Sequence, residues 1–496
     1  MSIQSNSIHK KHPGIFNDVL SPITPGPSSS NTCGPFRIAV LCRQLLAEKP
    51  VSFSMTMAES GGYADTFFSM QSDLGTIAGL LGKDLFTYNL ENSYPDAEKD
   101  NLHLSFDFSS TIPTYPSEMG EILISGQTHT LTLTAVSWGG GEIEITALNG
   151  HPVSLDGKSY TLVTFSHDGT PHCTTEGITK ENAGKKAKDA MTDQAVFRTA
   201  ILSPVFPFAC KEIPTPPFSN AVELVQLAEE SGLPLWELAL DYEKSIVKAS
   251  DDQLWAYAKT IYQIAVDSIQ YGKNPGLSFS GVTTPKTPQY MSALKQGNLI
   301  PLGTADTGCL DALSIMEFSN SHGKIICMPT GGASGIVPAA ILNTAKSLGF
   351  SHRKQIEALL VAGLFGLFYY PTHYSGSIGC QAEIGVAISM AAAALTSMLT
   401  DCPKTVEKAA SLGGQSVLGL VCNPIDGYVQ VPCILRNMTA VPTAITCANA
   451  ALGGLDSILP LDTVVDLMLE VGKNIKPCNR AGTFYTDALY RLHNRY

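Results

Sequence analysis

The sequence predicts an α+β protein, with an N-terminal α+β domain followed by a C-terminal domain that is mostly all-α. Before residue 166, stretches such as "LTLTAVSWGGGEIEITALNG" and "KSYTLVTFSHD" alternate or run β-rich between glycine turns, which indicates strands. After Asn220 the pattern is almost wholly helical, with long segments of Ala, Leu, Ile and Met. A chain of 496 residues has room for two or three domains of about 100–200 residues each.

Three segments follow one another along the chain. Residues 36–48, "FRIAVLCRQLLAE", have helical apolar periodicity and belong to an α+β domain expected over residues 20–170. Residues 171–215 are dense in Pro, Gly, Lys and Thr, which predicts a linker. Residues 216–496 are expected to form the helical domain.

Composition excludes several classes of protein. The formal net charge is −12 and no basic run is present, so sequence-independent nucleic-acid binding is not expected. The most apolar segments, "IEALLVAGLFGLFYY" and "GVAISMAAAALTSML", run 15 residues, whereas a membrane span needs about 20, so core helices are predicted. The twelve cysteines lack disulfide-framework spacing, which favours a reducing, cytoplasmic location without disulfides.

Three cysteines near the end of the chain raise the question of a metal site. Cys380 and Cys422 are separated by 41 residues, and Cys422 and Cys433 by 10, so none of the close pairs typical of structural zinc sites is present. Cys380 precedes a predicted helix and the other two fall in loops near prolines, settings that favour thiolate ligands. Three ligands would leave one iron of a cubane cluster open as a Lewis acid. Buried structural thiols fit the spacing as well.

Two loops rich in small residues are candidate binding elements. "GPSSSNTCGP", Gly26 to Pro35, precedes a helix, and its hydroxyl and backbone N–H groups could bind an anion. A simple N-cap loop is the alternative. "PTGGASG", Pro329 to Gly335, could approach a substrate or cluster, or could be a turn that feeds the next helix. No Lys follows its glycines, so it is not a phosphate-binding P-loop.

Long segments of both halves resemble the iron–sulfur-dependent L-serine dehydratases, a family that works without pyridoxal phosphate. In the C-terminal half the matching motifs are "CMPTGGASGIVPAAIL", "SGSIGCQAEIGVAISMAAAAL", "LGLVCNPIDGYVQVPCILRNMTAVPTAITCANAAL" and "EVGKNIKPCNRAGTF". In the N-terminal half they are "SPITPGPSSSNTCGPFRIAV", "GGYADTFFSMQSDLGTIAGLLG" and "SWGGGEIEITALNGHPV". The resemblance covers most of residues 20–165 and 218–485.

This resemblance implies a function and a site. A 4Fe–4S cluster would be held by Cys380, Cys422 and Cys433. The expected activity is that of a lyase acting on L-serine or a related small β-substituted amino or hydroxy acid, in a homodimer. The substrate carboxylate would be held by the serine-rich loop, which assigns that task to Ser28, Ser29, Ser30, Asn31 and Thr32. Some relatives continue into an ACT-like regulatory module, but here "SYTLVTFSHDGTPHC" passes into the linker, so a complete module is not expected.

The sequence departs from the family where the resemblance implies acid–base histidines. The family loop reads S-S-S-H-T, but Asn31 stands in the place of the histidine. The family segment G-H-G-T-D corresponds to "SMQSD", which places Met70 at the catalytic-base position, and an H-P-N motif falls within "DAEKDNLHL" without its histidine in register. Dehydration needs a base and an acid, and neither Met nor Asn titrates.

Two hypotheses follow from these departures. In the first, the chain is a cluster-dependent lyase with a relocated base, and His373 is the leading candidate because it precedes Cys380 by seven positions. The alternative for His373 is a packing or surface histidine. Asp73 and Tyr374 are the other candidates for acid–base work. In the second, the chain is a catalytically silent homologue that binds a small carboxylate or a partner around a structural cluster.

Overall fold

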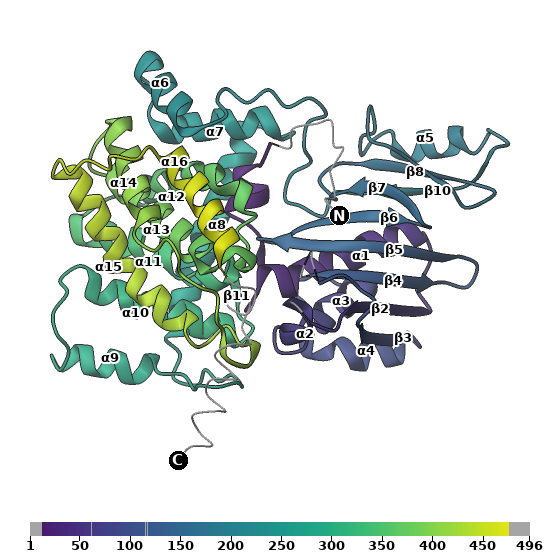
Figure 1. Ribbon diagram of the computed structural model, residues 1–496, viewed down its shortest axis with the longest axis horizontal. Helices are drawn as coiled ribbons and strands as arrows, with labels where there is room; N and C mark the ends of the chain where they lie inside the picture. Colours follow the sequence, from purple (N-terminus) through teal and green to yellow (C-terminus); the bar gives the residue numbers. More distant parts are fainter. Residues whose placement is uncertain (1–11, 61, 115, 117, 476–496) are drawn as a thin grey trace.

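The computed structural model describes residues 12–60, 62–114, 116 and 118–475. Two lobes lie side by side, one built on β-sheets and the other on helices, with the first described residues running between them (Figure 1). The predicted α+β class and the order of the two parts are therefore confirmed.

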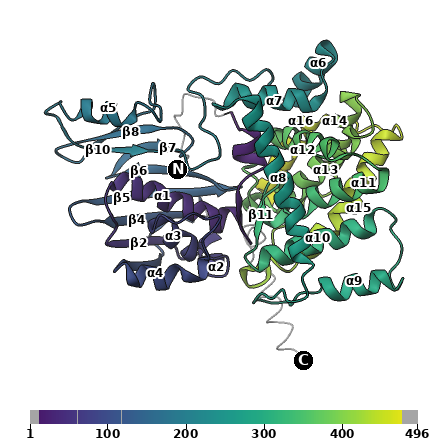
Figure 2. The same cartoon turned by 180° about the vertical axis from the view of Figure 1, so that it is seen from behind.

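A six-stranded sheet with helices on one face forms the centre of the α+β lobe. Its strand order is β3-β2-β4-β5-β6-β7, and every neighbouring pair is antiparallel except β2 with β3. The strands are β2 (Ser52–Ala58), β3 (His103–Ser109), β4 (Met119–Ser125), β5 (Thr130–Gly139), β6 (Glu142–Leu148) and β7 (His151–Leu155). The helices are α1 (Gly34–Leu46), α2 (Gly62–Thr66), α3 (Ser72–Leu80) and α4 (Ser93–Lys99), with a short turn η3 (Leu90–Asn92). Figure 2 shows α1 and α3 over the face of the sheet. Apolar residues of β4 and β5 alternate between buried and exposed positions, which explains why the sequence pattern found these strands.

A second, smaller sheet follows directly, and the prediction of a linker over residues 171–215 is wrong for its first part. Strands β8 (Thr161–Ser166), β9 (Pro171–Thr174) and β10 (Val196–Leu202) form an antiparallel sheet in the order β10-β8-β9. Helix α5 (Ala183–Ala190) packs on it by burying Ala183 and Ala187 against Leu162. The other face of α5 exposes lysines, and this polar face hid the short apolar stripe from the sequence pattern.

The helical lobe is arranged around one almost completely buried helix, α13 (Ile384–Ser397). Its small side chains let neighbouring helices approach closely, and α11, α12, α14 and α15 surround it. The other α-helices are α6 (Ala221–Ser231), α7 (Leu235–Ile246), α8 (Asp251–Gly272), α9 (Thr287–Lys295), α10 (Ala305–Asn320), α11 (Ile336–Leu348), α12 (His352–Gly366), α14 (Pro403–Gln415), α15 (Cys433–Leu452) and α16 (Leu461–Asn474). Short helical turns are η4 (Gly331–Ala333), η5 (Leu367–Thr372), η6 (Gly376–Ile378), η7 (Cys380–Ala382) and η8 (Ile425–Gly427).

One stretch within this lobe, Cys380–Ser397, is long and apolar enough to cross a membrane by length and composition alone. It is 89% buried inside the structure. Burial of this kind is what the core helix of a folded lobe shows, so its hydropathy is explained by packing.

The N-terminal segment of the described chain packs into the helical lobe, which the sequence analysis did not predict. The π-helical turn η1 (Ile15–Val19) lies in the helical core, where Phe16 is fully buried. Glu243 of α7 accepts hydrogen bonds from the backbone N–H groups of Ile15 (2.5 Å) and Phe16 (3.2 Å). Strand β1 (Ile23–Pro25) then pairs with β11 (Lys324–Ile326). The expected all-helical part therefore contains a two-stranded ribbon whose partner comes from the start of the chain.

Candidate active site

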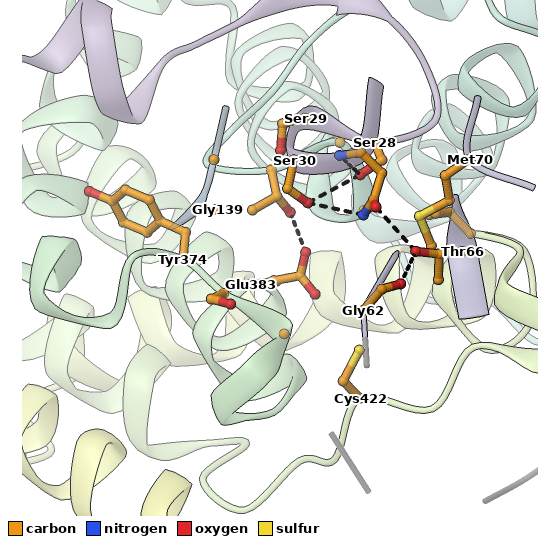
Figure 3. A pocket seen from close by; sticks show the side chains of 18 of the residues that line it. Ser28, Ser29, Ser30, Gly62, Thr66, Met70, Gly139, Tyr374, Glu383 and Cys422 are labelled. Carbon is orange, nitrogen blue, oxygen red and sulfur yellow. Dashed lines mark hydrogen bonds between the residues drawn. The ribbon is translucent and has the colours of Figure 1, made fainter. Parts of the chain in front are cut away.

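A cavity lies where the two lobes meet, and both lobes contribute to its wall (Figure 3). The α+β side supplies the loop Ser28–Asn31, Met70 and the β5–β6 turn at Gly139, while the helical lobe supplies Thr330 and Cys422 among others. Its volume is about 80 Å³, several times the roughly 10–15 Å³ that one water molecule requires. The cavity therefore has room for a small molecule.

The three cysteines predicted as ligands come together at this cavity. Cys380 begins η7, Cys422 lies in the loop after α14, and Cys433 is the first residue of α15. The sulfur atoms of Cys380 and Cys422 lie within 4.8 Å of each other and of a carboxylate oxygen of Glu383. Cys422 and Cys433 both line the cavity.

The environment of these thiols suits a thiolate-bound metal. A hydrogen bond with Cys380 and burial raise the pKa of Cys422, and burial together with the nearby Cys380 raises the pKa of Cys433. Neutral thiols in such a place lose their protons and become thiolate ligands when a metal cation compensates the negative charge. Gly376 leaves space beside these thiols, because a Cβ atom at this position would lie 3.0 Å from the sulfur of Cys422. The donor set and the room beside it fit a cysteine-bound iron–sulfur group.

Glu383 is a residue of this site that the sequence analysis missed. Its Oε1 accepts a hydrogen bond from Thr330 Oγ1 (2.8 Å), and the thiol of Cys380 lies 3.7 Å from its Oε2. Burial raises the pKa of the Glu383 carboxyl, although the hydrogen bonds from Thr330 and Cys380 oppose this. A signal existed in the sequence, because Glu383 is the one charged residue between Cys380 and the end of an otherwise uncharged helix.

The serine-rich loop faces the thiols from the other side of the cavity. Ser28 caps the π-helical turn η2 (Ser29–Cys33), and its Oγ accepts a hydrogen bond from the backbone N–H of Asn31 (3.1 Å). Ser28, Ser29, Ser30 and Asn31 line the cavity. Thr32 does not, since it is fully buried and donates its hydroxyl hydrogen bond to the carbonyl of Met70 (2.9 Å).

Asn31 and Met70, the two positions where the resemblance implies histidines, both line this cavity. Asn31 accepts a hydrogen bond from Thr66 Oγ1 (3.1 Å) through Oδ1 and is held in place by it. Met70 is 7% exposed and packs against Met316 and Val429. Among the described residues that line the cavity there is no histidine, lysine or arginine.

The structure does not bring His373 to the cavity. Its side chain is 43% exposed, its Nδ1 lies 3.1 Å from Glu142 Oε2, and its ring stacks on Trp138 with 5.6 Å between the ring centroids. Proximity in sequence to Cys380 misled the expectation, because the backbone at His373 and Tyr374 adopts left-handed conformations that redirect consecutive side chains.

Asp73 and Tyr374 are also placed away from catalytic geometry. Asp73 is buried in the first turn of α3, outside the cavity, and its Oδ2 accepts a hydrogen bond from Tyr94 (2.9 Å). Burial raises the pKa of Asp73. Tyr374 lines the cavity with its ring, but its hydroxyl donates to the carbonyl of Gly366 (3.0 Å) and points away from Glu383 (Figure 3).

A buried charged network lies behind the Gly139 turn and joins the lobes. Lys158 Nζ lies 2.6 Å from Asp18 Oδ1 and 3.5 Å from Glu142 Oε1, and Tyr370 donates a short hydrogen bond to Glu142. Burial opposes the charge on Glu142, yet Lys158 and His373 hold the pKa of that carboxyl well below its usual range. Burial likewise opposes the charge on Lys158, but Asp18 and its other neighbours raise the pKa of this amine. His373 is therefore part of this junction.

Comparison with known proteins identifies the family. Residues 230–481 match the model of the family described as "Serine dehydratase alpha chain", which is half of the chain. The chain belongs to this family. Within the described chain, the matched residues up to 475 lie in the helical lobe and include Cys380, Cys422 and Cys433.

Individual serine dehydratases agree with this assignment. The chain is 32% identical over 269 residues to the "L-serine dehydratase, alpha chain" of Peptoniphilus asaccharolyticus, covering 52% of this chain and 89% of that protein. It is 27% identical over 260 residues to the "Probable L-serine dehydratase, alpha chain" of Bacillus subtilis, covering 52% and 87%. It is 33% identical over 282 residues to "L-serine dehydratase 1" of Escherichia coli, covering 54% of this chain and 61% of that protein, less than two thirds of its length. The predicted resemblance, and an enzyme of this kind, are thereby confirmed at the level of the family.

Proposed function

We propose that the protein is an iron–sulfur-dependent lyase that eliminates a β-substituent from L-serine or a related small amino or hydroxy acid. The observation that supports this most is the meeting of three cysteines and a serine-rich loop across one small cavity. The names of its relatives supply the reaction class. The arrangement of this chain's own residues supplies a place for each part of such a substrate.

In this proposal Cys380, Cys422 and Cys433 hold a 4Fe–4S cluster. Three protein ligands leave one iron open, and when bound the cluster would supply a Lewis acid for the departing hydroxyl group. The thiols reach it from three separate segments, the start of η7, the loop after α14 and the start of α15. The glycines at 332 and 376 keep bulky side chains away from Glu383 and Cys422.

The serine-rich loop would bind the substrate carboxylate. Ser28, Ser29 and Ser30 line the cavity, and the first turn of η2 lies there too. Hydroxyl groups and the free N–H groups of a helical turn are donors that a carboxylate accepts from. Because no lysine or arginine lines the described part of the cavity, these neutral donors would carry the binding.

Glu383 would face the substrate from the cluster side. Thr330 fixes one of its carboxylate oxygens, and the other lies beside Cys380. A carboxylate in this position would accept a hydrogen bond from the ammonium or hydroxyl group of a bound amino acid. Its burial strengthens such a bond, because little water competes for the acceptor.

Anaerobic reconstitution with iron and sulfide, followed by assay on L-serine, L-threonine and small 2-hydroxy acids, tests the proposal. Elimination of water from L-serine and hydrolysis of the resulting enamine release ammonia and a keto acid in equal amounts. We expect both products from wild type and neither from protein without iron. Iron uptake without any lyase activity would instead favour a silent homologue with a structural cluster, the reading that Asn31 and Met70 suggest. A cytoplasmic homodimer remains a prediction of the same proposal.

A further inference from the structure

The segments that carry the three cysteines are tied together from behind by polar side chains that do not line the cavity. These side chains are Gln381, Arg436 and Asn437. Each one hydrogen-bonds to backbone groups or to a side chain of a different segment. We call these three residues the clamp.

Gln381 joins the first cysteine segment to the second. It is fully buried, and its Nε2 donates to the carbonyl of Met468 on α16 (3.0 Å) and to that of Ile378 (2.8 Å). Its Oε1 accepts from the backbone N–H of Gly419 (2.9 Å). Its own N–H donates to the carbonyl of Leu420 (3.2 Å). Gln381, the residue after Cys380, is thus hydrogen-bonded to Gly419 and Leu420, which lie just before Cys422 in the sequence.

Arg436 joins the second cysteine segment to the third. It lies in the first turn of α15, three residues after Cys433. Its guanidinium donates to the carbonyl of Val421 (3.0 Å) and to Oδ1 of Asn423 (2.7 Å), the two residues on either side of Cys422. A planar guanidinium with two donors in use fixes orientation as well as distance.

Asn437 joins the third cysteine segment to the glycine loop of the cavity wall. It is fully buried, and its Oδ1 accepts from the backbone N–H of Gly335 (3.0 Å). Its Nδ2 donates to the carbonyl of Gly332 (2.7 Å) and to the carbonyl of Cys433 (2.9 Å). Two of these hydrogen bonds go to the glycine loop and one goes to the first turn of α15. Because the amide nitrogen donates both of its hydrogens, the position suits Asn better than Asp.

We propose that Gln381, Arg436 and Asn437 are positioning residues that preset the three thiols for iron–sulfur binding and couple them to the glycine loop. The proposal rests on the cluster of the proposed function. One backbone hydrogen bond, from Gln381 N–H to the carbonyl of Leu420, joins the first two cysteine segments, and the clamp side chains add further hydrogen bonds between the segments. Groups that hold the ligands of a metal typically change its affinity or the activity about 10–100-fold when they are replaced.

The test compares isosteric variants of the clamp with a matched control on the same helix. Asn437→Asp and Gln381→Glu keep shape but replace donors by acceptors, and Asn449→Asp makes the same change at an exposed position of α15. Iron loss to a chelator from anaerobically reconstituted protein is measured beside thermal unfolding of the metal-free protein. We expect chelator resistance to fall about 10–100-fold in the clamp variants and less than twofold in the control.

Several results would overturn the proposal. One is a folded clamp variant with an unfolding temperature and chelator resistance equal to those of wild type. Another is that none of the three clamp variants folds, because the clamp would then serve the stability of the lobe as a whole. These variants are Asn437→Asp, Gln381→Glu and Arg436→Lys. A clamp variant in which chelator resistance and unfolding temperature fall together would also contradict the proposal. The loss of iron would then follow from lower stability of the whole lobe.

A second measurement separates this proposal from the proposed function. If wild type binds no iron, the cluster is wrong, but the spacing of the thiols can still be read in metal-free protein. A trivalent arsenical bridges two thiols that lie close together, and peptide mass spectrometry locates the bridge. We expect a bridge between Cys380 and Cys422 in wild type and in Asn449→Asp, reduced at least fivefold in Gln381→Glu. An equal yield in all three would exclude a positioning role for Gln381.

Discussion

The two lobes contribute to the cavity in different chemical ways. The helical lobe provides sulfur and carboxylate groups, Cys380, Cys422, Cys433 and Glu383, from the starts of helices and the loops before them. The α+β lobe provides hydroxyl groups and backbone turns, together with the carboxylate of Glu118 and the thioether of Met70, but no thiol among its described lining residues. The helical lobe is also the part that the family model matches, while Asn31 and Met70 lie on the other side. In the proposed function, the residues that would hold the cofactor therefore lie in the lobe that the family model matches, and Asn31 and Met70 lie on the side proposed for the substrate.

The largest effect is expected from the helical lobe. Replacing Cys380, Cys422 and Cys433 together by Ser should abolish binding of iron and sulfide, because a serine hydroxyl is a poor ligand for the soft cluster iron. Metal and sulfide analysis after anaerobic reconstitution measures this. Cys173→Ser and Cys402→Ser, at exposed thiols, are the controls. Wild-type iron and sulfide content in the triple variant would refute the assignment.

A smaller effect is expected at the carboxylate of the same lobe. Glu383→Gln keeps the bond to Thr330 but removes a charged acceptor, worth about 1.5–3 kcal/mol or roughly 10–150-fold. We expect kcat/KM to fall by about that factor with unchanged iron content. Glu407→Gln is the control, since Glu407 is a half-buried carboxylate of this lobe that caps α16 far from the cavity. Activity equal to wild type would remove Glu383 from the site.

The substrate side should respond more weakly, because several neutral donors share the carboxylate. Ser28→Ala combined with Ser30→Ala removes two hydroxyls, each worth about 0.5–1.5 kcal/mol, so KM should rise about 5–150-fold. Loss of the Ser28 cap also costs about 1 kcal/mol of stability. Ser250→Ala removes a cap from α8 and controls for this. Unchanged KM in the double variant would take the loop out of the substrate site.

The smallest effect is expected at His373. Because its ring lies outside the cavity and bonds Glu142 at the junction of the lobes, His373→Asn should change kcat less than about threefold. The loss of one half-exposed ion pair should cost about 1 kcal/mol or less. Steady-state kinetics and thermal unfolding measure the two effects. A hundredfold fall in kcat at normal iron content would restore His373 as a base.

Sequence motifs singled out residues that the fold brings together. Residues 28–31, Cys422 and Cys433 come from separate segments and line one cavity, and Cys380 lies beside Cys422. The α+β order of the chain was also predicted, because alternation and helical periodicity report burial directly. Proximity in sequence to these residues was a poorer guide to a place in the cavity. Thr32 follows Asn31 and His373 precedes Cys380 by seven positions, yet neither lines the cavity.

The failures have identifiable physical causes. Helix α5 was missed because it buries only the small side chains of Ala183 and Ala187 while its exposed face carries lysines. Strand β10 was missed although its sequence, VFRTAIL, is rich in β-branched and aromatic residues. Glu383 was missed because its proximity to Cys422 depends on tertiary packing across 39 positions of sequence. The N-terminal ribbon with β11 involves pairing between Ile23 and Ile326, a separation that no local pattern encodes.

That ribbon has a consequence for the order in which the molecule is completed during synthesis. Ile326 is translated 303 residues after its partner Ile23, which takes about 15–60 s at roughly 5–20 residues per second. For that interval the apolar residues of η1 lack α12, and for most of it they also lack α7, two of the helices that pack on them. Ser28 follows the end of β1 by three residues, so its final position waits for the ribbon. The serine-rich side of the cavity is therefore synthesised early and fixed late, and the helical side, from Thr330 to Cys433, is translated only after β11.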